Sequence, residues 1–168
     1  MTSVEGRGRR IETPTTFASD DGTADPRWAP AFAAGDGAAV EQILRSGVRL
    51  LVPIVSVLDE IDDDGSDKSS HMASVSLVQA DGRRGLLAFT SVESMARWDP
   101  QARPVPAWAR DVAAAAVEEG ADGVLVDVAG PVAFAIDGEL LAELADAGRG
   151  TGETGSGAMT EAATEQDR

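Results

Sequence analysis

Residues 74–100, SVSLVQADGRRGLLAFTSVESMARWDP, contain the pattern that decides the fold. Polar and apolar residues alternate over 74–79, which predicts a strand with one buried face. Asp81-Gly82 is a strong hairpin turn signal, so the apolar stretch 85–90 is expected to return antiparallel to that strand. Ser91 is a suitable N-cap for the helical spacing that follows it. A hairpin that leads directly into a helix indicates an α+β domain.

Helices and strands are also predicted on both sides of this stretch. Helical spacing indicates helices near 26–34, 37–46, 107–119 and 139–146, and apolar, β-branched runs indicate strands near 48–58, 123–128 and 132–136. Pro53 predicts that its strand has an edge position or a bulge. Residues 104–106 are predicted to form a rigid connector, and Pro106 suits the first position of the helix that follows. We therefore expect an α+β fold with a single, mainly antiparallel sheet of about five strands and helices packed on it.

The composition is that of an acidic protein without cysteine. Its 168 residues, of which 43% are apolar, suit one domain. A net charge of −15 argues against binding to nucleic acid or to an anionic membrane surface, because both need clustered Lys and Arg. The longest apolar stretch, 50–58, is shorter than the ~20 residues of a membrane span, and the N-terminal residues include no apolar signal region. We expect a cytoplasmic protein.

Both ends of the chain differ in composition from the middle. Residues 1–23 and 148–168 are rich in Gly and polar residues and have no hydrophobic periodicity. Such segments bury too little apolar surface to offset the entropy lost on ordering. Composition alone therefore predicts disordered tails over 1 to about 23 and over 148–168.

The residue types of common catalytic and metal sites are scarce. A Ser-His-Asp arrangement would need the single histidine, His71, beside Ser69, Ser70 or Ser91, and no serine lies in a G-x-S-x-G pattern. Residues 60–65 resemble the start of a calcium loop, but His71 stands where that loop needs its bidentate Glu. We assign no catalytic residue, no metal ligand and no cofactor. A metal site made only of carboxylates is the alternative that the sequence leaves. Over 59–70 we expect a solvated acidic loop.

Polar residues beside predicted strands are the candidates for binding a ligand or a partner. Thr90 and Ser91 end a strand and begin a helix, so their hydroxyls and the free N–H groups either hold a small anion or only cap the helix. Lys68, Ser69 and Ser70 lie in the acidic loop. If this loop folds over Thr90 and Ser91, the five residues would form one site.

Two further features have both a functional and a structural interpretation. Asp127 lies within an apolar strand, where partial burial would raise its pKa as a catalytic or metal-binding carboxylate requires. It could equally be a partner of the Gly130-Pro131 turn. Trp98 and Trp108 flank several prolines, which is typical of a peptide-binding groove but also of a core corner between two helices.

Several short blocks occur in an order that is typical of one family. They are FASDDG (17–22), ADP (24–26), RLLVPIV (49–55), KSSHMA (68–73), DGRRGLLAFTS (81–91), ARWDP (96–100), RPV (103–105) and LVDVAGP (125–131). With this set the chain resembles the SseB-like (enhanced serine sensitivity) family. The resemblance implies an SseB N-terminal-type domain with an α/β or α+β fold, and implies that Phe17 docks on it. The folded domain is then expected to begin at Phe17, so we predict disordered tails at 1–16 and 148–168 and a folded domain over 17–147. It brings no catalytic residue or cofactor, and His71 replaces an acidic residue of the family pattern.

These observations favour a non-enzymatic cytoplasmic binding or protein-interaction module. We expect its partner to be a protein or a small ligand. The candidate binding residues are Lys68, Ser69, Ser70, Thr90, Ser91 and Asp127. The alternative is a small-molecule or metal-dependent enzyme or sensor that uses the loop hydroxyls and Asp127.

Overall fold

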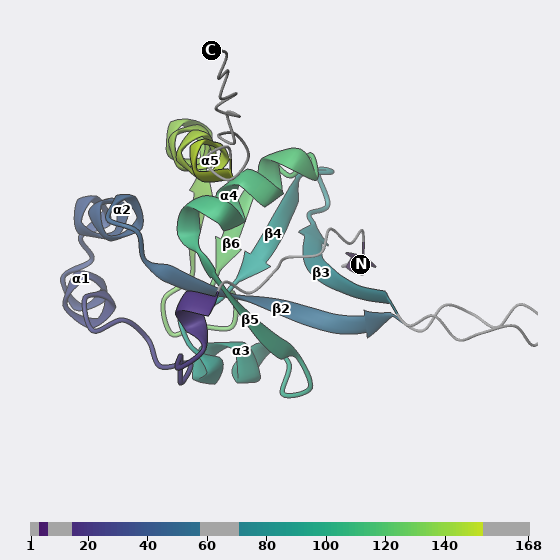
Figure 1. Cartoon of the computed structure of the whole chain (residues 1–168), viewed down its shortest axis with the longest axis horizontal. Helices are drawn as coiled ribbons and strands as arrows, with labels where there is room; N and C mark the ends of the chain where they lie inside the picture. The colour runs from purple at the N-terminus through teal and green to yellow at the C-terminus, as the bar shows by residue number, and fades with distance from the viewer. Residues whose placement is uncertain (1–3, 7–14, 58–70, 153–168) are drawn as a thin grey trace, which may run out of the picture.

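The computed structural model describes residues 4–6, 15–57 and 71–152, which form helices packed on a mixed sheet (Figure 1). The strands are β1 (Val4–Gly6), β2 (Arg49–Val57), β3 (His71–Val78), β4 (Arg84–Ala88), β5 (Arg103–Trp108), β6 (Gly123–Val126) and β7 (Phe134–Asp137). The helices are the 3-10 helix η1 (Thr15–Phe17), α1 (Trp28–Ala34), α2 (Gly37–Arg45), α3 (Val92–Trp98), α4 (Ala109–Glu118) and α5 (Gly138–Gly152). None of the described helices is long and apolar enough to cross a membrane.

The strands form one sheet in the order β5-β2-β3-β4-β6-β7, and β1 pairs with β3 outside this path. The β4–β6 pair is parallel, because its connection crosses over through α3, β5 and α4, and the other described pairs are antiparallel. The predicted Asp81-Gly82 hairpin joins β3 to β4, and Gly82 has the positive φ of +87° that the turn needs. The predicted α+β fold with one mainly antiparallel sheet is confirmed, with more strands than expected.

Pro53 and the prolines of β5 lie in a regular strand pair, β2–β5. Leu51 of β2 exchanges two backbone hydrogen bonds of 2.8 Å with Phe89, which lies on the side of β2 away from β5. Because backbone N–H and C=O groups alternate between the two sides of a strand, the other odd-numbered residues of β2 also direct these groups away from β5. Pro104 and Pro106 are opposite odd-numbered residues, so the ladder needs no N–H from either proline. The predicted connector at 104–106 is therefore wrong.

The alternatives predicted for Pro53, an edge strand or a bulge, are not observed: β2 lies between β5 and β3, and its register with β5 is continuous through Pro53. Pro53 is tolerated because the pairing of β2 with β3 begins one residue later, at Ile54.

The helix predicted over 107–119 begins later, at Ala109. Ala109 donates its N–H to the carbonyl of Val48 at 2.9 Å, which continues the β5–β2 ladder past Pro106 and Trp108. Pro106 is thus in a strand and not at the first position of a helix. Pairing with a distant strand decides where α4 begins.

Described structure extends past both ends of the predicted domain, 17–147. β1 lies within 1–16, where we predicted a tail, and pairs with β3. α5 continues to Gly152 and packs on α4 at Gly148, where a Cβ atom would lie 2.5 Å from the carbonyl oxygen of Arg110. α5 is therefore longer than the predicted helix at 139–146 and contacts α4 closely near its C-terminal end.

Helices cover both faces of the sheet. α1, α2, α4 and α5 enclose the larger core, in which Trp28, Leu50 and Ile136 are buried. α3 lies against the other face (Figure 1), where a smaller core forms around Phe89. Phe17 is only 9% exposed, and its ring centroid lies 4.7 Å from that of Trp108, which confirms the predicted docking of Phe17.

Candidate functional site

Ser91 begins α3 and forms a reciprocal capping box with Ser94. The Ser91 hydroxyl accepts the Ser94 N–H at 3.0 Å, and the Ser94 hydroxyl accepts the Ser91 N–H at 3.2 Å. The next donor, the Val92 N–H, is bound by the Gly22 carbonyl at 2.9 Å. The predicted capping role of Ser91 is confirmed, and these three donors at the start of the helix have partners in the protein.

Thr90 lies one residue earlier and is bound to Asp127 through both of its donors. The Thr90 N–H donates to Oδ1 of Asp127 at 2.9 Å, and the Thr90 hydroxyl donates to Oδ2 at 2.6 Å. Asp127 is 1% exposed and has a φ of +52°, a left-handed conformation that Asp tolerates better than most residues. Its carbonyl accepts the Gly130 N–H at 2.8 Å, as the turn interpretation predicted. Because β4 and β6 are parallel neighbours, Thr90 and Asp127 meet just beyond their carboxyl ends.

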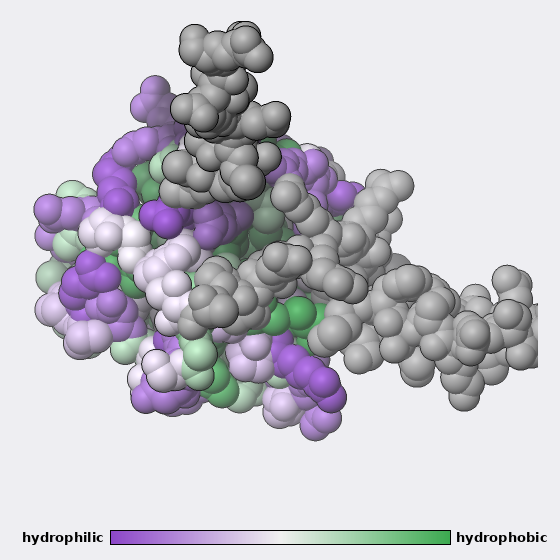
Figure 2. All heavy atoms as spheres, viewed as in Figure 1, coloured by the Kyte–Doolittle hydropathy of each residue, from purple (hydrophilic) through white to green (hydrophobic). Residues whose placement is uncertain are grey.

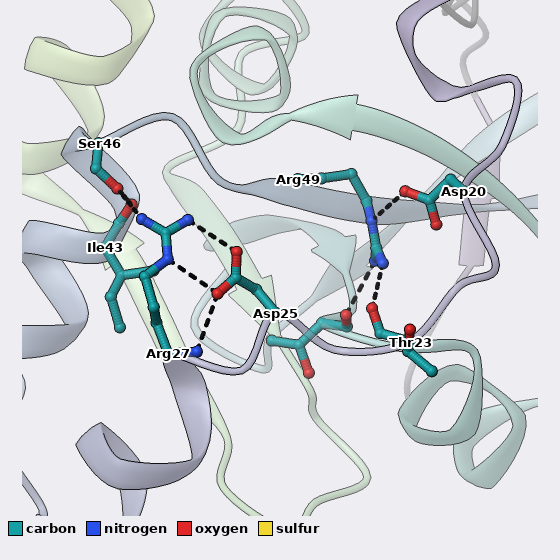
Figure 3. A network of polar contacts seen from close by, with 8 residues as sticks. Asp20, Thr23, Asp25, Arg27, Ile43, Ser46 and Arg49 are labelled. Carbon is teal, nitrogen blue, oxygen red and sulfur yellow. Dashed lines mark hydrogen bonds and ion pairs between the residues drawn. The ribbon is translucent and has the colours of Figure 1, made fainter.

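Arg49, at the start of β2, joins Thr90 to the segment that precedes α1, and Figure 3 shows its contacts with Asp20 and Thr23 of that segment. Its Nε donates to Oδ2 of Asp20 at 2.7 Å, its Nη1 donates to the Thr90 carbonyl at 3.0 Å, and its Nη2 donates to the Thr23 carbonyl. The side chains of Arg49 and Asp20 are 12% and 15% exposed. One guanidinium therefore links three segments of chain, and its charge is balanced by a partly buried carboxylate.

We call Asp20, Arg49, Thr90 and Asp127 the polar junction. Thr90 and Asp127 were separate candidates in the sequence. Their contact was not predicted, and Arg49 and Asp20 had no predicted role. The signal for Arg49 was present: a single cation at the start of a buried apolar strand needs a polar partner.

The other predicted site residues are not part of this cluster. Lys68, Ser69 and Ser70 lie outside the described residues, as does the acidic stretch 60–65. A site that combines them with Thr90 and Ser91 therefore stays a prediction. Within 4–6, 15–57 and 71–152, no three His, Asp or Glu side chains are grouped as metal ligands would be.

Trp98 and Trp108 each pack on an aromatic ring of their own. The Trp98 ring lies 5.7 Å from that of Phe89, in the core under α3. Trp108 packs on Phe17, at the end of β5. The two tryptophans contribute to packing at different places, and neither lines the groove between α1–α2 and β7.

A groove of about 560 Å³ lies between α1–α2 and β7 with the start of α5. We call it the α1–β7 groove. Its apolar lining is Ala31, Phe32, Val40, Leu44, Val132, Phe134, Ala135 and Leu140. Phe32 and Phe134 are half-buried and both pack against the buried Trp28: Phe32 stacks on it at a centroid distance of 5.4 Å, and the Phe134 ring is tilted against it at 5.6 Å. Buried aromatic packing thus holds two partly exposed rings in the groove.

The charged residues of the α1–β7 groove are mostly acidic. They are Asp36, Glu41, Asp137 and Glu139, with Arg45 as the single cation. Arg45 is already paired, since its Nε lies 3.0 Å from Glu143 and its Nη1 lies 3.0 Å from Glu41. These hydrogen bonds, first that of Glu143, raise the pKa of Arg45. The groove therefore combines an apolar lining with a negative charge. No local pattern in the sequence predicted this groove, because its two walls, 31–45 and 132–140, are distant in sequence.

The comparison with protein families identifies the domain. A family model described as the SseB protein N-terminal domain matches residues 30–143. The chain belongs to the SseB family. Comparisons with curated proteins and with solved structures found no match.

The family match covers both features of the SseB domain described above. The whole lining of the α1–β7 groove falls within the matched range, as do Arg49, Thr90 and Asp127. Asp20 and Phe17 precede it. The predicted resemblance is confirmed, and it carries a domain description without a reaction, so a function has to be argued from the surface itself.

Proposed function

We propose that this SseB domain is a non-enzymatic, cytoplasmic binding module that holds a segment of a partner protein in the α1–β7 groove. The observation that carries the proposal is the pair of half-buried rings, Phe32 and Phe134, in a groove with an acidic border. A partner that covers these rings removes apolar surface from water, which favours binding. Both rings are held in place by Trp28, so little order has to be gained on binding.

The polar junction supports this choice by contrast. The hydroxyls of Thr90 and Ser91 and both carboxylate oxygens of Asp127 have hydrogen-bond partners inside the chain. In this proposal they maintain the strand ends and the start of α3. A ligand at Thr90 would have to replace its bonds to Asp127, whereas a partner in the groove displaces only water.

The test is selection of ligands from a displayed peptide library with the full chain and two matched variants. Val40→Glu puts a charge into the groove at a half-buried helix position, where Glu is a good helix former. Val117→Glu makes the same change on α4, at a valine that is 38% exposed and does not line the groove. Thermal melting first verifies that both variants fold.

The proposal predicts peptides that bind the wild type and Val117→Glu but lose at least about tenfold in affinity for Val40→Glu. If the selected peptides bind all three proteins equally, the partner docks elsewhere. If the wild type selects no peptide, a peptide-binding function is refuted.

A further inference from the structure

The α1–β7 groove runs beside an open edge of the sheet. β7 is the last strand in the order and pairs with β6 on its inner side. Among the described strands, none pairs with its outer side. Phe134, Ala135 and Asp137 of β7 also line the groove, so this edge and the apolar lining face the same space.

The hydrogen-bond pattern shows which groups of β7 point outward. Asp127 donates its N–H to the Ala88 carbonyl of β4 at 3.1 Å, so the carbonyl of Val126, on the opposite side of that peptide group, points to β7. The partner of Val126 is Phe134, which therefore faces inward. Because backbone polar groups alternate along a strand, Ala135 directs its N–H and C=O to the open edge.

The side chains around this edge define what could pair with it. Phe134 and Ile136 face the core side of β7, where Phe32 and Leu140 add apolar surface. Asp137 lies at the end of the strand. The groove border is acidic, and its one cation, Arg45, is already paired with Glu41 and Glu143. A strand laid along β7 would meet apolar side chains on one face and carboxylates at its border.

We infer that the partner segment binds as an added β-strand on the outer edge of β7, and that its sequence alternates apolar and basic residues. This inference rests on the proposed function. The backbone of the segment would pair with Ala135. Its apolar residues would cover Phe32 and Phe134 on the core-side face of β7. The Lys or Arg residues between them would point to the opposite face, which Ala135 and Asp137 share, and would lie nearest the Asp137 carboxylate, a charge complementarity that an acidic segment lacks.

The experiment measures fluorescence anisotropy of labelled synthetic peptides of about eight residues with the full chain. The panel is an alternating Val/Lys peptide, an alternating Val/Glu peptide, a peptide with the Val/Lys composition in a helical repeat, and the Val/Lys peptide with N-methyl groups on alternate amides. The last peptide is made in two versions, one methylated on the odd-numbered amides and one on the even-numbered amides. Only one of these two sets of N–H groups would face β7, so only one version should lose the hydrogen bonds to that strand.

Two protein variants test the edge directly. Ala135→Pro removes the outward N–H, which takes no part in the β6–β7 ladder, while Ala135→Val keeps it. We expect the Val/Lys peptide to bind the wild type and Ala135→Val alike. Affinity is expected to fall about tenfold or more for Ala135→Pro, for the acidic peptide and for one of the two N-methylated peptides. Melting curves verify that Ala135→Pro folds, and the N-methylated peptides test the same bond on the wild type.

The inference is overturned if the helical-repeat peptide binds more tightly than the alternating one, or if neither N-methylated peptide loses affinity. A further result would also overturn it: none of the panel peptides binds, but peptides selected from the library still bind the wild type and lose affinity for Val40→Glu. In that case the proposed function stands and only the added-strand mode fails. If neither the panel nor the library yields a groove-dependent ligand, the proposed function fails as well.

Discussion

At the scale of single residues, Thr90 and Asp127 form a buried pair joined by two hydrogen bonds. A carboxylate that is 1% exposed loses its hydration, and both of its oxygens regain a donor from one residue, Thr90. Hydrogen bonds to a charged acceptor are stronger than neutral ones, which offsets part of the cost of burial. The Thr90 carbonyl in turn accepts from Arg49, so the carboxylate and the guanidinium are linked through one residue.

Thr90→Val is predicted to lower the free energy of unfolding by about 1–3 kcal/mol, because it leaves Oδ2 of Asp127 buried without its hydroxyl donor. Thr90→Ser keeps the hydroxyl and loses only a methyl group, so its cost is expected to be about 1 kcal/mol. Urea denaturation of both variants measures the difference. Equal losses for Val and Ser would contradict a role for the hydroxyl in stability.

At the scale of elements, the segment before α1 is ordered although most of it is neither helix nor strand. Phe17 packs on Trp108, Asp20 pairs with Arg49, and the Gly22 carbonyl binds the start of α3. Gly22 is needed there, because its φ is +77° and a Cβ atom would lie 2.2 Å from Cγ2 of Val92. Three separate contacts thus hold this segment against the sheet.

Arg49→Lys is predicted to loosen this segment without unfolding the core. A lysine ammonium cannot bind Asp20, Thr23 and Thr90 in the fork geometry of a guanidinium. Amide hydrogen exchange over 18–25 is expected to accelerate, while α4 and α5 keep their protection.

Arg45→Lys is the matched control for this measurement. Its ion pairs to Glu41 and Glu143 are more exposed, with 42% of the Arg45 side chain accessible, and pairs of this kind contribute little. Two results would count against the role of Arg49: amide exchange over 18–25 is unchanged in Arg49→Lys, or it is accelerated equally in Arg45→Lys.

The contact between α4 and β3 has a predicted pH dependence. Burial raises the pKa of Glu119, against the opposing effects of its hydrogen bond from Ser74 and of nearby Arg84. The folded state therefore binds this proton more tightly than the unfolded chain. Ionised Glu119 lowers stability at neutral pH, and this loss disappears as the pH falls below the ordinary glutamate value of 4.5.

Glu119→Gln keeps an acceptor for Ser74 and removes the charge. We expect it to raise Tm most at about pH 7 and progressively less toward about pH 4, where Glu119 is protonated in both states. Thermal melts of both proteins across this range measure the difference. A change in Tm that is the same at every pH would show that the substitution acts through packing and not through the charge.

At the scale of the whole molecule, charge and burial act in opposite directions. Two hydrophobic cores, one on each face of the sheet, favour the compact state. A net charge of −15 opposes it by self-repulsion, and hydrophilic residues dominate the described surface visible in Figure 2. Most of the described ion pairs are well exposed and offset little of this repulsion.

Added salt is therefore predicted to stabilise the fold. Raising NaCl from about 0.01 to 0.15 M shortens the Debye length from about 30 to 8 Å, which screens repulsion between distant carboxylates. We expect Tm to rise over this range at neutral pH. A Tm that falls with salt would mean that attractive ion pairs such as Arg49–Asp20 dominate over the repulsion.

Features that depend on neighbours in sequence were predictable. Asp36 directly precedes the predicted helix at 37–46, and it caps α2 by accepting the Ala39 N–H at 3.1 Å. Ser91 caps α3, and Asp81-Gly82 forms the hairpin, for the same local reasons. The candidate residues Thr90 and Asp127 were found through polar signals at strand ends. Their contact was not predicted, since it depends on the parallel β4–β6 pair.

The sequence by itself determined the local structure, the acidic charge and the α+β class, because caps, turns and hydrophobic periodicity act over a few residues. Only the tertiary structure decided that 103–108 is a strand, since its prolines fit the non-hydrogen-bonded positions opposite β2. Only the tertiary structure joined Arg49 to Asp20 and Thr90, and brought α1 and α2 beside β7 to form the groove. These contacts join residues far apart in the chain, so they depend on strand register and helix packing, which no local pattern specifies.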